Sequence, residues 1–125
     1  MSSFTPTVAV LDDEPKMRKA LRRLLGAHGL RVTEFAQAGE FLAAYAEHPA
    51  VCLVLDLQMP EVGGLELLEV MARRGITLPV IVITAHDEPD MRQRAIDLGV
   101  SAYLTKPVNE AALLDAVHAA IAPAT

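Results

Sequence analysis

The sequence predicts an α/β domain in which helices cover both faces of a doubly wound parallel sheet. Short apolar segments alternate along the chain with segments of helical periodicity. The third and fourth apolar segments contain no interrupting polar residue, which is typical of parallel strands buried on both faces. The 125 residues fit one compact domain, and 52% hydrophobic against 22% charged residues supply enough apolar material for its core.

Five segments rich in β-branched and other apolar residues are predicted as strands. They are Thr7–Leu11, Arg31–Phe35, Val51–Asp56, Pro79–Thr84 and Ala102–Thr105. In doubly wound sheets, ligands bind beyond the carboxyl ends of the strands. The residues that end these strands are therefore the first candidates for a functional site.

The segments between the strands are predicted as helices, and the first has the clearest pattern. Its apolar face comprises Met17, Ala20, Leu21, Leu24 and Leu25, and the opposite face comprises Lys16, Arg18, Lys19, Arg22 and Arg23. Gly29, Gly75 and Gly99 follow helical segments as left-handed C-cap residues. Asp87 and Asn109 are predicted to cap the amino ends of the last two helices.

The overall charge and the single cysteine restrict the environment and the partners. A net charge of -5 disfavours direct binding to nucleic acid and to anionic membranes. Cys52 lies within an apolar strand, so a buried free thiol is expected, which suits a reducing cytoplasm. No apolar run approaches the roughly 18 to 20 residues that span a bilayer, and no export signal is recognisable. We expect a cytoplasmic protein.

Polar residues stand at the carboxyl ends of four predicted strands. Asp12 and Asp13 follow the first, Asp56 and Thr84 end the third and fourth, and Lys106 follows the fifth. Each has a purely structural explanation: Asp13 as a helix cap, Asp56 as a turn former, Thr84 as a β-former and Lys106 as a solvated charge. Together, however, three nearby carboxylates repel one another unless a cation neutralises them. An all-oxygen ligand set favours Mg²⁺.

The same residues fit phosphoryl transfer. Lys106 offers a compact positive charge and Thr84 a hydroxyl for phosphoryl oxygens. An aspartate can accept the group as an acyl phosphate. Asp56, fixed at the end of a buried strand, is the candidate acceptor, whereas the Asp12 and Asp13 pair is better arranged to hold the cation.

Four segments resemble the receiver domains of two-component response regulators, in the same order and over nearly the whole chain. They are VLDDE, LVLDLQMPEVGGLELL, PVIVITA and AYLTKP. The pattern around CLVLDLQMP and RGITLPVIVITAH is most similar to FixJ-type receivers. The resemblance implies the flavodoxin-like strand order 2-1-3-4-5. It also implies a single receiver domain over residues 1–125, folded over about residues 5–122, with residues 123–125 as a tail or the start of a linker.

This resemblance implies a phosphorylation-controlled signalling switch rather than a conventional enzyme. Asp56 would receive a phosphoryl group from a phosphohistidine on a sensor histidine kinase or phosphotransfer protein. Mg²⁺ would be held by Asp12, Asp13, Asp56 and the backbone carbonyl of Gln58, and Thr84 and Lys106 would contact the phosphoryl group. The domain would assist its own phosphorylation and autodephosphorylation.

The resemblance further implies a cis peptide bond between Lys106 and Pro107 and a switch that couples Thr84 to Tyr103. From the residues alone, Tyr103 is expected as a half-buried strand aromatic. Phosphorylation would alter the face formed by the fourth helix, fifth strand and fifth helix. We also expect it to strengthen a weak homodimer through the fourth helix and fifth strand. Gln58 and His86 would tune the lifetime of the phosphoaspartate, and the sequence does not tell whether they lengthen or shorten it. The alternative for His86 is a solvated loop histidine with no such role.

Other functions and the nature of the output are left open at this stage. Aspartyl-nucleophile, Mg²⁺-dependent phosphohydrolases usually carry a second aspartate two residues after the first, where this chain has Gln58, and they add a cap domain that is not recognisable here. A flavodoxin-like cofactor module would carry a glycine-rich loop after the first strand, where DDEPK stands. The chain is either a stand-alone regulator or a receiver separated from an output domain, for which FixJ kinship favours a helix-turn-helix domain.

Overall fold

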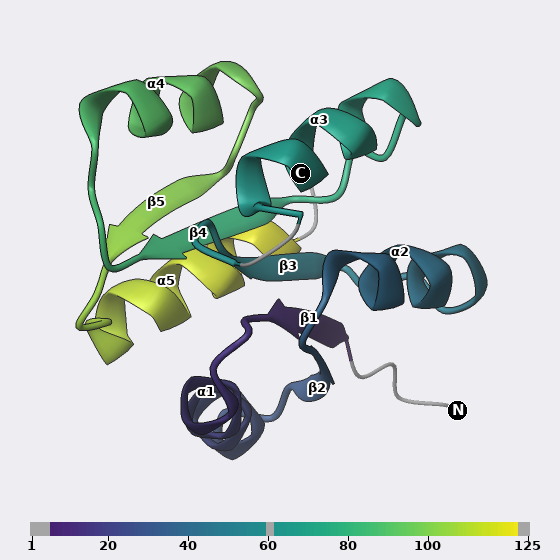
Figure 1. Ribbon diagram of the computed structural model, residues 1–125. Helices are drawn as coiled ribbons and strands as arrows, with labels where there is room; N and C mark the ends of the chain where they lie inside the picture. Colours follow the sequence, from purple (N-terminus) through teal and green to yellow (C-terminus); the bar gives the residue numbers. More distant parts are fainter. Residues whose placement is uncertain (1–5, 60–61, 123–125) are drawn as a thin grey trace.

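The computed structural model describes residues 6–59 and 62–122, and contains a five-stranded sheet with helices on both faces (Figure 1). The predicted tail at residues 123–125 lies outside the described residues. The strands are β1 (Thr7–Leu11), β2 (Arg31–Phe35), β3 (Cys52–Asp56), β4 (Val80–Thr84) and β5 (Ala102–Thr105). Their order is β2-β1-β3-β4-β5 and every neighbouring pair is parallel, which confirms the predicted fold class and strand order.

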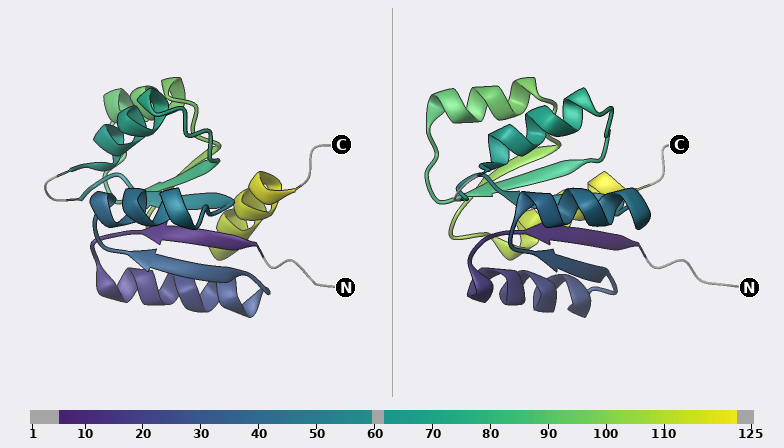
Figure 2. Two further views of the ribbon diagram at one scale, coloured as in Figure 1. Left: turned by 90° about the vertical axis from the view of Figure 1, so that its right-hand side faces the viewer. Right: turned by 45° about the vertical axis from the view of Figure 1, so that its right-hand side comes forward.

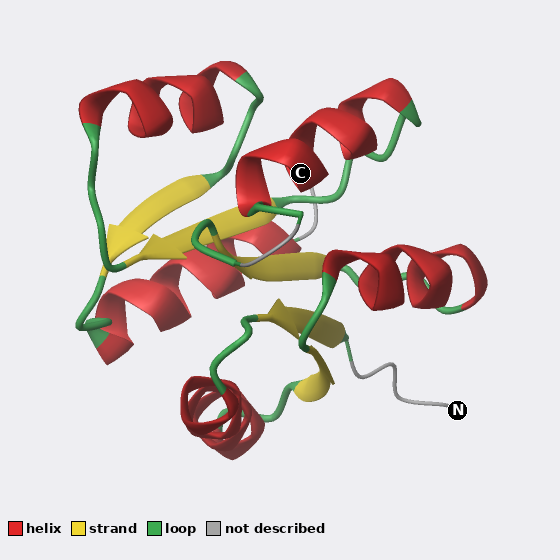
Figure 3. Cartoon of the chain, viewed as in Figure 1, coloured by secondary structure: helices red, strands yellow, loops and turns green. Residues whose placement is uncertain are grey.

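The helices connect the strands in strict alternation (Figure 3). They are α1 (Pro15–Ala27), α2 (Ala38–Glu47), α3 (Gly64–Arg73), α4 (Pro89–Asp97) and α5 (Glu110–Ile121). Strands β3 and β4 each begin one residue later than predicted, and for β4 the reason is that Pro79 has no N–H to donate to the ladder. In the described part of the chain, no helix is long and apolar enough to cross a membrane.

The core lies on both faces of the sheet because side chains alternate along each strand. Leu53 and Leu55 pack with α2 and α3, whereas Val54 packs on the opposite face with α1 and α5. Figure 2 shows α1 and α5 on one side of the sheet and the other three helices across from them. All five residues of β3 and of β4 are buried, so these two strands form the rigid centre of the domain.

The helix ends follow the predicted pattern with two exceptions. Gly29, Gly75 and Gly99 have φ values of 82°, 71° and 88°, as expected for left-handed C-caps. The Asn109 side chain accepts a hydrogen bond from the Ala112 N–H at 2.9 Å, which confirms that cap. The predicted cap at Asp87 is wrong, and so is the structural alternative in which Asp13 caps the first helix.

Glu14 and Glu88 take those two N-cap positions instead, and a proline follows each of them as the first helical residue. A proline at this position is already set to a helical φ and removes one of the unpaired N–H groups at the start of the helix. Neither N-cap side chain makes a capping hydrogen bond. Asp87 is free to face Arg92, with 3.6 Å between its Oδ2 and Nη1.

Helix α1 differs from its predicted amphipathic pattern at Ala20 and Arg18. Leu21 and Leu25 are its buried residues, and they mark the centre of the face that packs against the sheet. Ala20 lies outside this face and is exposed, whereas Arg18 lies at its border and is half-buried. One basic side chain of α1 is therefore directed toward the protein rather than toward solvent.

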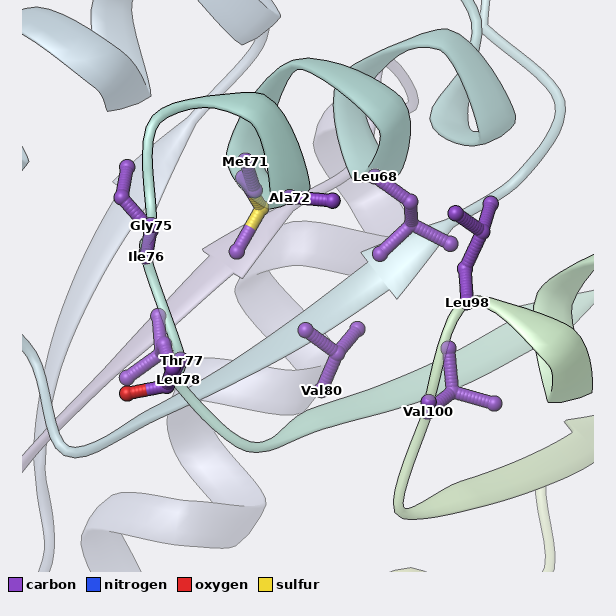
Figure 4. Close-up of a pocket in the computed structure, with 11 residues that line it drawn as sticks. Leu68, Met71, Ala72, Gly75, Ile76, Thr77, Leu78, Val80, Leu98 and Val100 are labelled. Atoms are coloured by element: carbon purple, nitrogen blue, oxygen red, sulfur yellow. The ribbon is translucent and has the colours of Figure 1, made fainter.

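A cavity of about 320 Å³ lies between α3, the segment leading into β4, and the turn between α4 and β5 (Figure 4). Leu68, Met71, Val80, Leu98 and Val100 line it. Helix α4 is loosely embedded above this region, since Ala95 is its one buried residue among those described. The α4 side of the sheet is thus packed less densely than the β3 and β4 centre.

The first turn of α3 requires a glycine at position 64 because it approaches the end of β3. A Cβ at Gly64 would lie 2.7 Å from the Leu57 Cα and 2.9 Å from the Asp56 carbonyl oxygen. At Gly63 the nearest atoms would be 3.8 Å away. We expect Gly64→Ala to lower the unfolding free energy by about 1–3 kcal/mol through overpacking, and Gly63→Ala to cost less, as measured by urea denaturation. Equal losses for the two variants would contradict this explanation.

Candidate functional site

Four strands end at the same edge of the sheet and bring the predicted site residues together. The parallel register pairs Leu11 with Leu55, Asp56 with Ile83, and Thr84 with Thr105. The carboxyl ends of β1, β3, β4 and β5 are therefore level, and Asp12, Asp56, Thr84 and Lys106 lie at or directly after them (Figure 1). The alternation of strands and helices places these residues together although they are up to 94 positions apart.

Three carboxylates form a compact acidic cluster at this edge. Asp12, Asp13 and Asp56 each offer an oxygen, and these atoms all lie within 4.8 Å of one another. Asp12 and Asp56 are buried, whereas Asp13 is exposed at the mouth of the site. Such a set of oxygen donors is able to bind a hard divalent cation.

Lys106 lies between the two buried carboxylates. Its Nζ is 3.2 Å from the Asp12 Oδ2 and 3.6 Å from the Asp56 Oδ2. Burial alone would lower the pKa of Lys106, but the negative charges of Asp12 and Asp56 outweigh it and the pKa is raised. Lys106 is therefore a permanent positive charge that balances part of the acidic cluster.

The fold strongly affects the protonation of the Asp56 carboxylate. Burial is the main cause that raises its pKa to about 6, and the charges of Asp12 and Asp13 add to this effect. The Gln58 N–H, which donates to the Asp56 Oδ1 at 3.0 Å, and the charge of Lys106 oppose it. Asp56 is therefore mostly ionised at neutral pH, at an energetic cost to the folded state.

A cavity of about 510 Å³ opens over Asp56. Its lining residues are Asp13, Glu14, Asp56, Gln58, Ala85, His86 and Lys106. Glu14 had no predicted role, and its N–H donates to the Asp12 Oδ1 at 2.9 Å. The position of Glu14 directly after Asp12 and Asp13 is the sequence feature that could have identified it as part of the site. The cavity leaves the Asp56 carboxylate accessible to a small group from solvent.

Thr84 ends β4 beside this cavity but its hydroxyl is engaged elsewhere. The side chain is fully buried. Its Oγ1 accepts a hydrogen bond from the His86 N–H at 3.2 Å, and the hydroxyl donates to the His86 carbonyl oxygen at 3.3 Å. In this conformation the Thr84 hydroxyl stabilises its own turn and is not among the groups that line the cavity.

Tyr103 is half-buried on β5, next to the turn that follows β4. Its hydroxyl is buried and makes no hydrogen bond of regular geometry among the described residues, although Asp87 lies close to it. Burial raises the pKa of Tyr103, with the charge of Asp87 as a further cause. The Arg92 guanidinium lies over the ring, 5.4 Å from its centroid. The Lys106–Pro107 peptide bond that follows β5 is cis.

Comparison with known proteins is consistent with this arrangement of fold and site. A family model described as the response regulator receiver domain matches residues 8–118. The chain belongs to this family. Receiver domains of response regulators are signalling domains rather than conventional enzymes, which argues against the phosphohydrolase interpretation.

Individual relatives support the predicted FixJ kinship of this receiver domain. The transcriptional regulatory protein FixJ of Azorhizobium caulinodans is 39% identical over 91% of this chain and 54% of its own length. The transcriptional regulatory protein TdiR of Thauera aromatica is 40% identical over 93% of this chain and 51% of its own. The chain thus spans about half the length of these curated relatives.

Solved structures agree with the same assignment. The crystal structure titled FixJ-N has a TM-score of 0.88 at 32% identity and covers 98% of both chains. The response regulator StyR has a TM-score of 0.83 at 39% identity, and the match covers 94% of this chain and 60% of StyR. The receiver fold predicted from the sequence is therefore confirmed.

The raised pKa of Asp56 predicts a dependence of stability on pH. Because the folded pKa of about 6 exceeds the ordinary value of 3.8, ionising Asp56 destabilises the fold progressively as pH rises through this interval. In EDTA at pH 7.5 we expect Asp56→Asn to raise the free energy of unfolding by roughly 2–3 kcal/mol, and to have a much smaller effect at pH 4.5. Thermal unfolding at both pH values measures this.

Asp115→Asn is the matched control, because Asp115 is exposed on α5 and far from the acidic cluster in the sequence. It should change the melting temperature little and equally at both pH values. If Asp56→Asn gave the same shift at pH 4.5 and 7.5, the burial of an ionised Asp56 would not be the cause.

Proposed function

We propose that this receiver domain is a phosphorylation-controlled switch in which Asp56 accepts a phosphoryl group. The donor would be a phosphohistidine on a sensor histidine kinase or on a phosphotransfer protein. The observation that carries the proposal is the Asp56 carboxylate itself, which is fixed at the end of a fully buried strand, opens onto a cavity, and lies 3.6 Å from the Lys106 Nζ. Membership of the receiver family supports it.

Each residue at the site has a distinct part in this reaction. An Asp56 carboxylate oxygen would attack the phosphorus, forming an acyl phosphate while the bond from phosphorus to the donor imidazole nitrogen breaks. Lys106 would move from the carboxylates to a phosphoryl oxygen and balance its charge. The Thr84 hydroxyl would bond a second oxygen, which requires it to leave its bonds to His86.

The acidic cluster fits a Mg²⁺ ion. Three carboxylates face a single ammonium group, so negative charge remains to be balanced, and their oxygens are close enough to share one ion. We infer that Asp12, Asp13, Asp56 and the backbone carbonyl of Gln58 hold it. When bound, Mg²⁺ would supply positive charge to the transferring phosphoryl oxygens. The open cavity leaves room for the waters that Mg²⁺ usually keeps.

The output of the switch would be a change in the face formed by α4, β5 and α5. Movement of Thr84 toward the phosphoryl group would vacate space next to Tyr103, whose buried hydroxyl makes no hydrogen bond of regular geometry among the described residues. Helix α4 lies next to this space, since the guanidinium of its Arg92 lies over the Tyr103 ring. Gln58 and His86 line the same cavity as Asp56, so they would influence attack by water and hence autodephosphorylation.

The curated relatives indicate the kind of output. FixJ and TdiR are about twice as long as this chain and are named transcriptional regulatory proteins. We propose that the phosphorylated receiver likewise controls a transcriptional output, either in the same polypeptide or through a partner. The receiver itself carries a net charge of -5, so direct nucleic-acid binding would fall to that output.

The first test is phosphorylation by a small donor. We expect acetyl phosphate and Mg²⁺ to add one phosphoryl group to the wild-type protein and to Asp115→Asn, and none to Asp56→Asn, because the variant lacks the nucleophile. Intact-mass spectrometry measures the adduct, and EDTA should abolish it. An adduct that persists on Asp56→Asn or in EDTA would contradict the proposal. Repeated turnover of external phosphate esters would support a phosphohydrolase instead.

The second test addresses dimerisation through α4 and β5. Ile96 on α4 is 49% exposed, unusually so for a large aliphatic side chain, and would lie in such an interface. With Mg²⁺ and beryllium fluoride as a phosphoryl mimic, the wild type should sediment as a dimer and Ile96→Glu as a monomer. Ala43→Glu, at an exposed position on α2, is the control and should still dimerise. A wild type that stays monomeric with the mimic would refute the dimer.

A further inference from the structure

Asp12 is held in place by contacts from several parts of the fold. Its N–H donates to the Phe35 carbonyl oxygen on β2 at 3.2 Å, its Oδ1 accepts from the Glu14 N–H, and its Oδ2 faces Lys106. The fourth group is its backbone carbonyl oxygen, and Arg18 Nη1 donates to this oxygen at 2.6 Å. An arginine of α1 therefore completes the set of contacts around a buried aspartate of the acidic cluster.

Arg18 is itself oriented by Glu34 on β2. Its Nε lies 3.8 Å from the Glu34 Oε1, while Arg22 Nη1 lies 3.1 Å from the Glu34 Oε2. The Arg18 side chain is only 18% exposed, against 67% for that of Arg22. Arg18 thus lies against the turn after β1, whereas its neighbour one helical turn later extends into solvent.

The Asp12 carbonyl belongs to the peptide group that leads into Asp13. Because a peptide group is planar, fixing this oxygen also fixes the N–H and the start of the Asp13 backbone. Within residues 6–59 and 62–122, no hydrogen bond or ion pair holds the Asp13 carboxylate. The position of this exposed carboxylate therefore depends on the backbone that Arg18 anchors.

We propose that Arg18 is a positioning residue for the acidic pair: it presets Asp12 and Asp13 for a divalent cation without contacting the cation. This inference rests on the proposed Mg²⁺ site. It assigns a role to a charged side chain that the phosphoryl-transfer chemistry does not use.

Charge and positioning predict opposite effects when Arg18 is removed. A nearby positive charge repels Mg²⁺, so its loss alone would tighten Mg²⁺ binding. Loss of the hydrogen bond to the Asp12 carbonyl would release the peptide group and weaken binding, because the ligands must then be ordered by the ion. The sign of the change therefore separates the two effects.

The experiment is a calorimetric titration of the metal-free protein with Mg²⁺ at constant ionic strength. Supporting contacts of metal ligands typically contribute about 10- to 100-fold in affinity, and for an ion that keeps much of its water we expect Arg18→Met to weaken Mg²⁺ binding by roughly 5- to 10-fold. Arg18→Lys keeps the charge and one donor and should fall between. Arg23→Met removes an equivalent charge from an exposed position on α1 and is the control, expected within about 2-fold of wild type.

Phosphorylation by acetyl phosphate provides a second readout. If Arg18 acts only through cation affinity, saturating Mg²⁺ should restore the rate of Arg18→Met to the wild-type rate. Thermal unfolding of each variant, recorded without Mg²⁺, shows whether it is folded at the titration temperature, and Arg18→Lys serves if Arg18→Met is not.

The outcomes distinguish this inference from the proposed function. Unchanged or tighter Mg²⁺ binding by folded Arg18→Met or Arg18→Lys would overturn the role of Arg18 while leaving the metal site intact. A wild-type protein that binds no Mg²⁺ would overturn both. A loss of stability with unchanged affinity would show that Arg18 serves only the fold.

Discussion

The concentration of negative charge at one edge of the sheet is the constraint on which the rest of the structure depends. Three carboxylates lie within 4.8 Å of one another, two of them buried, and the burial of Asp56 raises its pKa. Such an arrangement does not arise in a flexible chain, because repulsion and hydration would separate the charges. It persists here because β1, β3 and β4 end at the same level of the sheet, which holds the buried Asp12 and Asp56 close to each other.

The counter-charges divide the site into a fixed part and a movable part. Lys106 faces Asp12 and Asp56 but is attached through a flexible side chain, so it can follow charge as it moves. Asp12, by contrast, is held through its N–H, its carbonyl and its carboxylate. A fixed Asp12 and a movable Lys106 suit a site that must hold its metal ligands in place while a phosphoryl group enters and leaves.

The sequence predicted the fold closely because its signals are local. Apolar runs located all five strands, and three glycines marked helix ends with the expected positive φ. The order of the residues then predicted the acidic cluster, since the carboxyl ends of parallel strands lie at the same edge of the sheet. The features that could not be predicted depend on the packing of one helix or strand against another.

Three residues illustrate that limit. The inward direction of Arg18 and the exposure of Ala20 depend on how α1 rotates against β2, and hydrophobic periodicity alone does not fix that rotation. The need for glycine at position 64 depends on the approach of α3 to the backbone after β3. Both are properties of contacts between distant segments.

The cavity between α3 and the turn after α4 makes the α4 side of the sheet less densely packed than its centre at β3 and β4. Protein interiors are nearly incompressible where they are close-packed, as around β3 and β4. The region next to α4 instead contains a cavity lined by flexible aliphatic side chains such as Met71 and Leu98. Ala95 is the one buried residue of α4 among those described, so a shift of this helix breaks fewer dispersion contacts than a shift of β3 or β4 would. The acidic cluster thus lies on the rigid strands β3 and β4, whereas α4 lies on the more loosely packed side of the sheet. A small displacement at the acidic cluster would therefore move α4 more readily than the central strands.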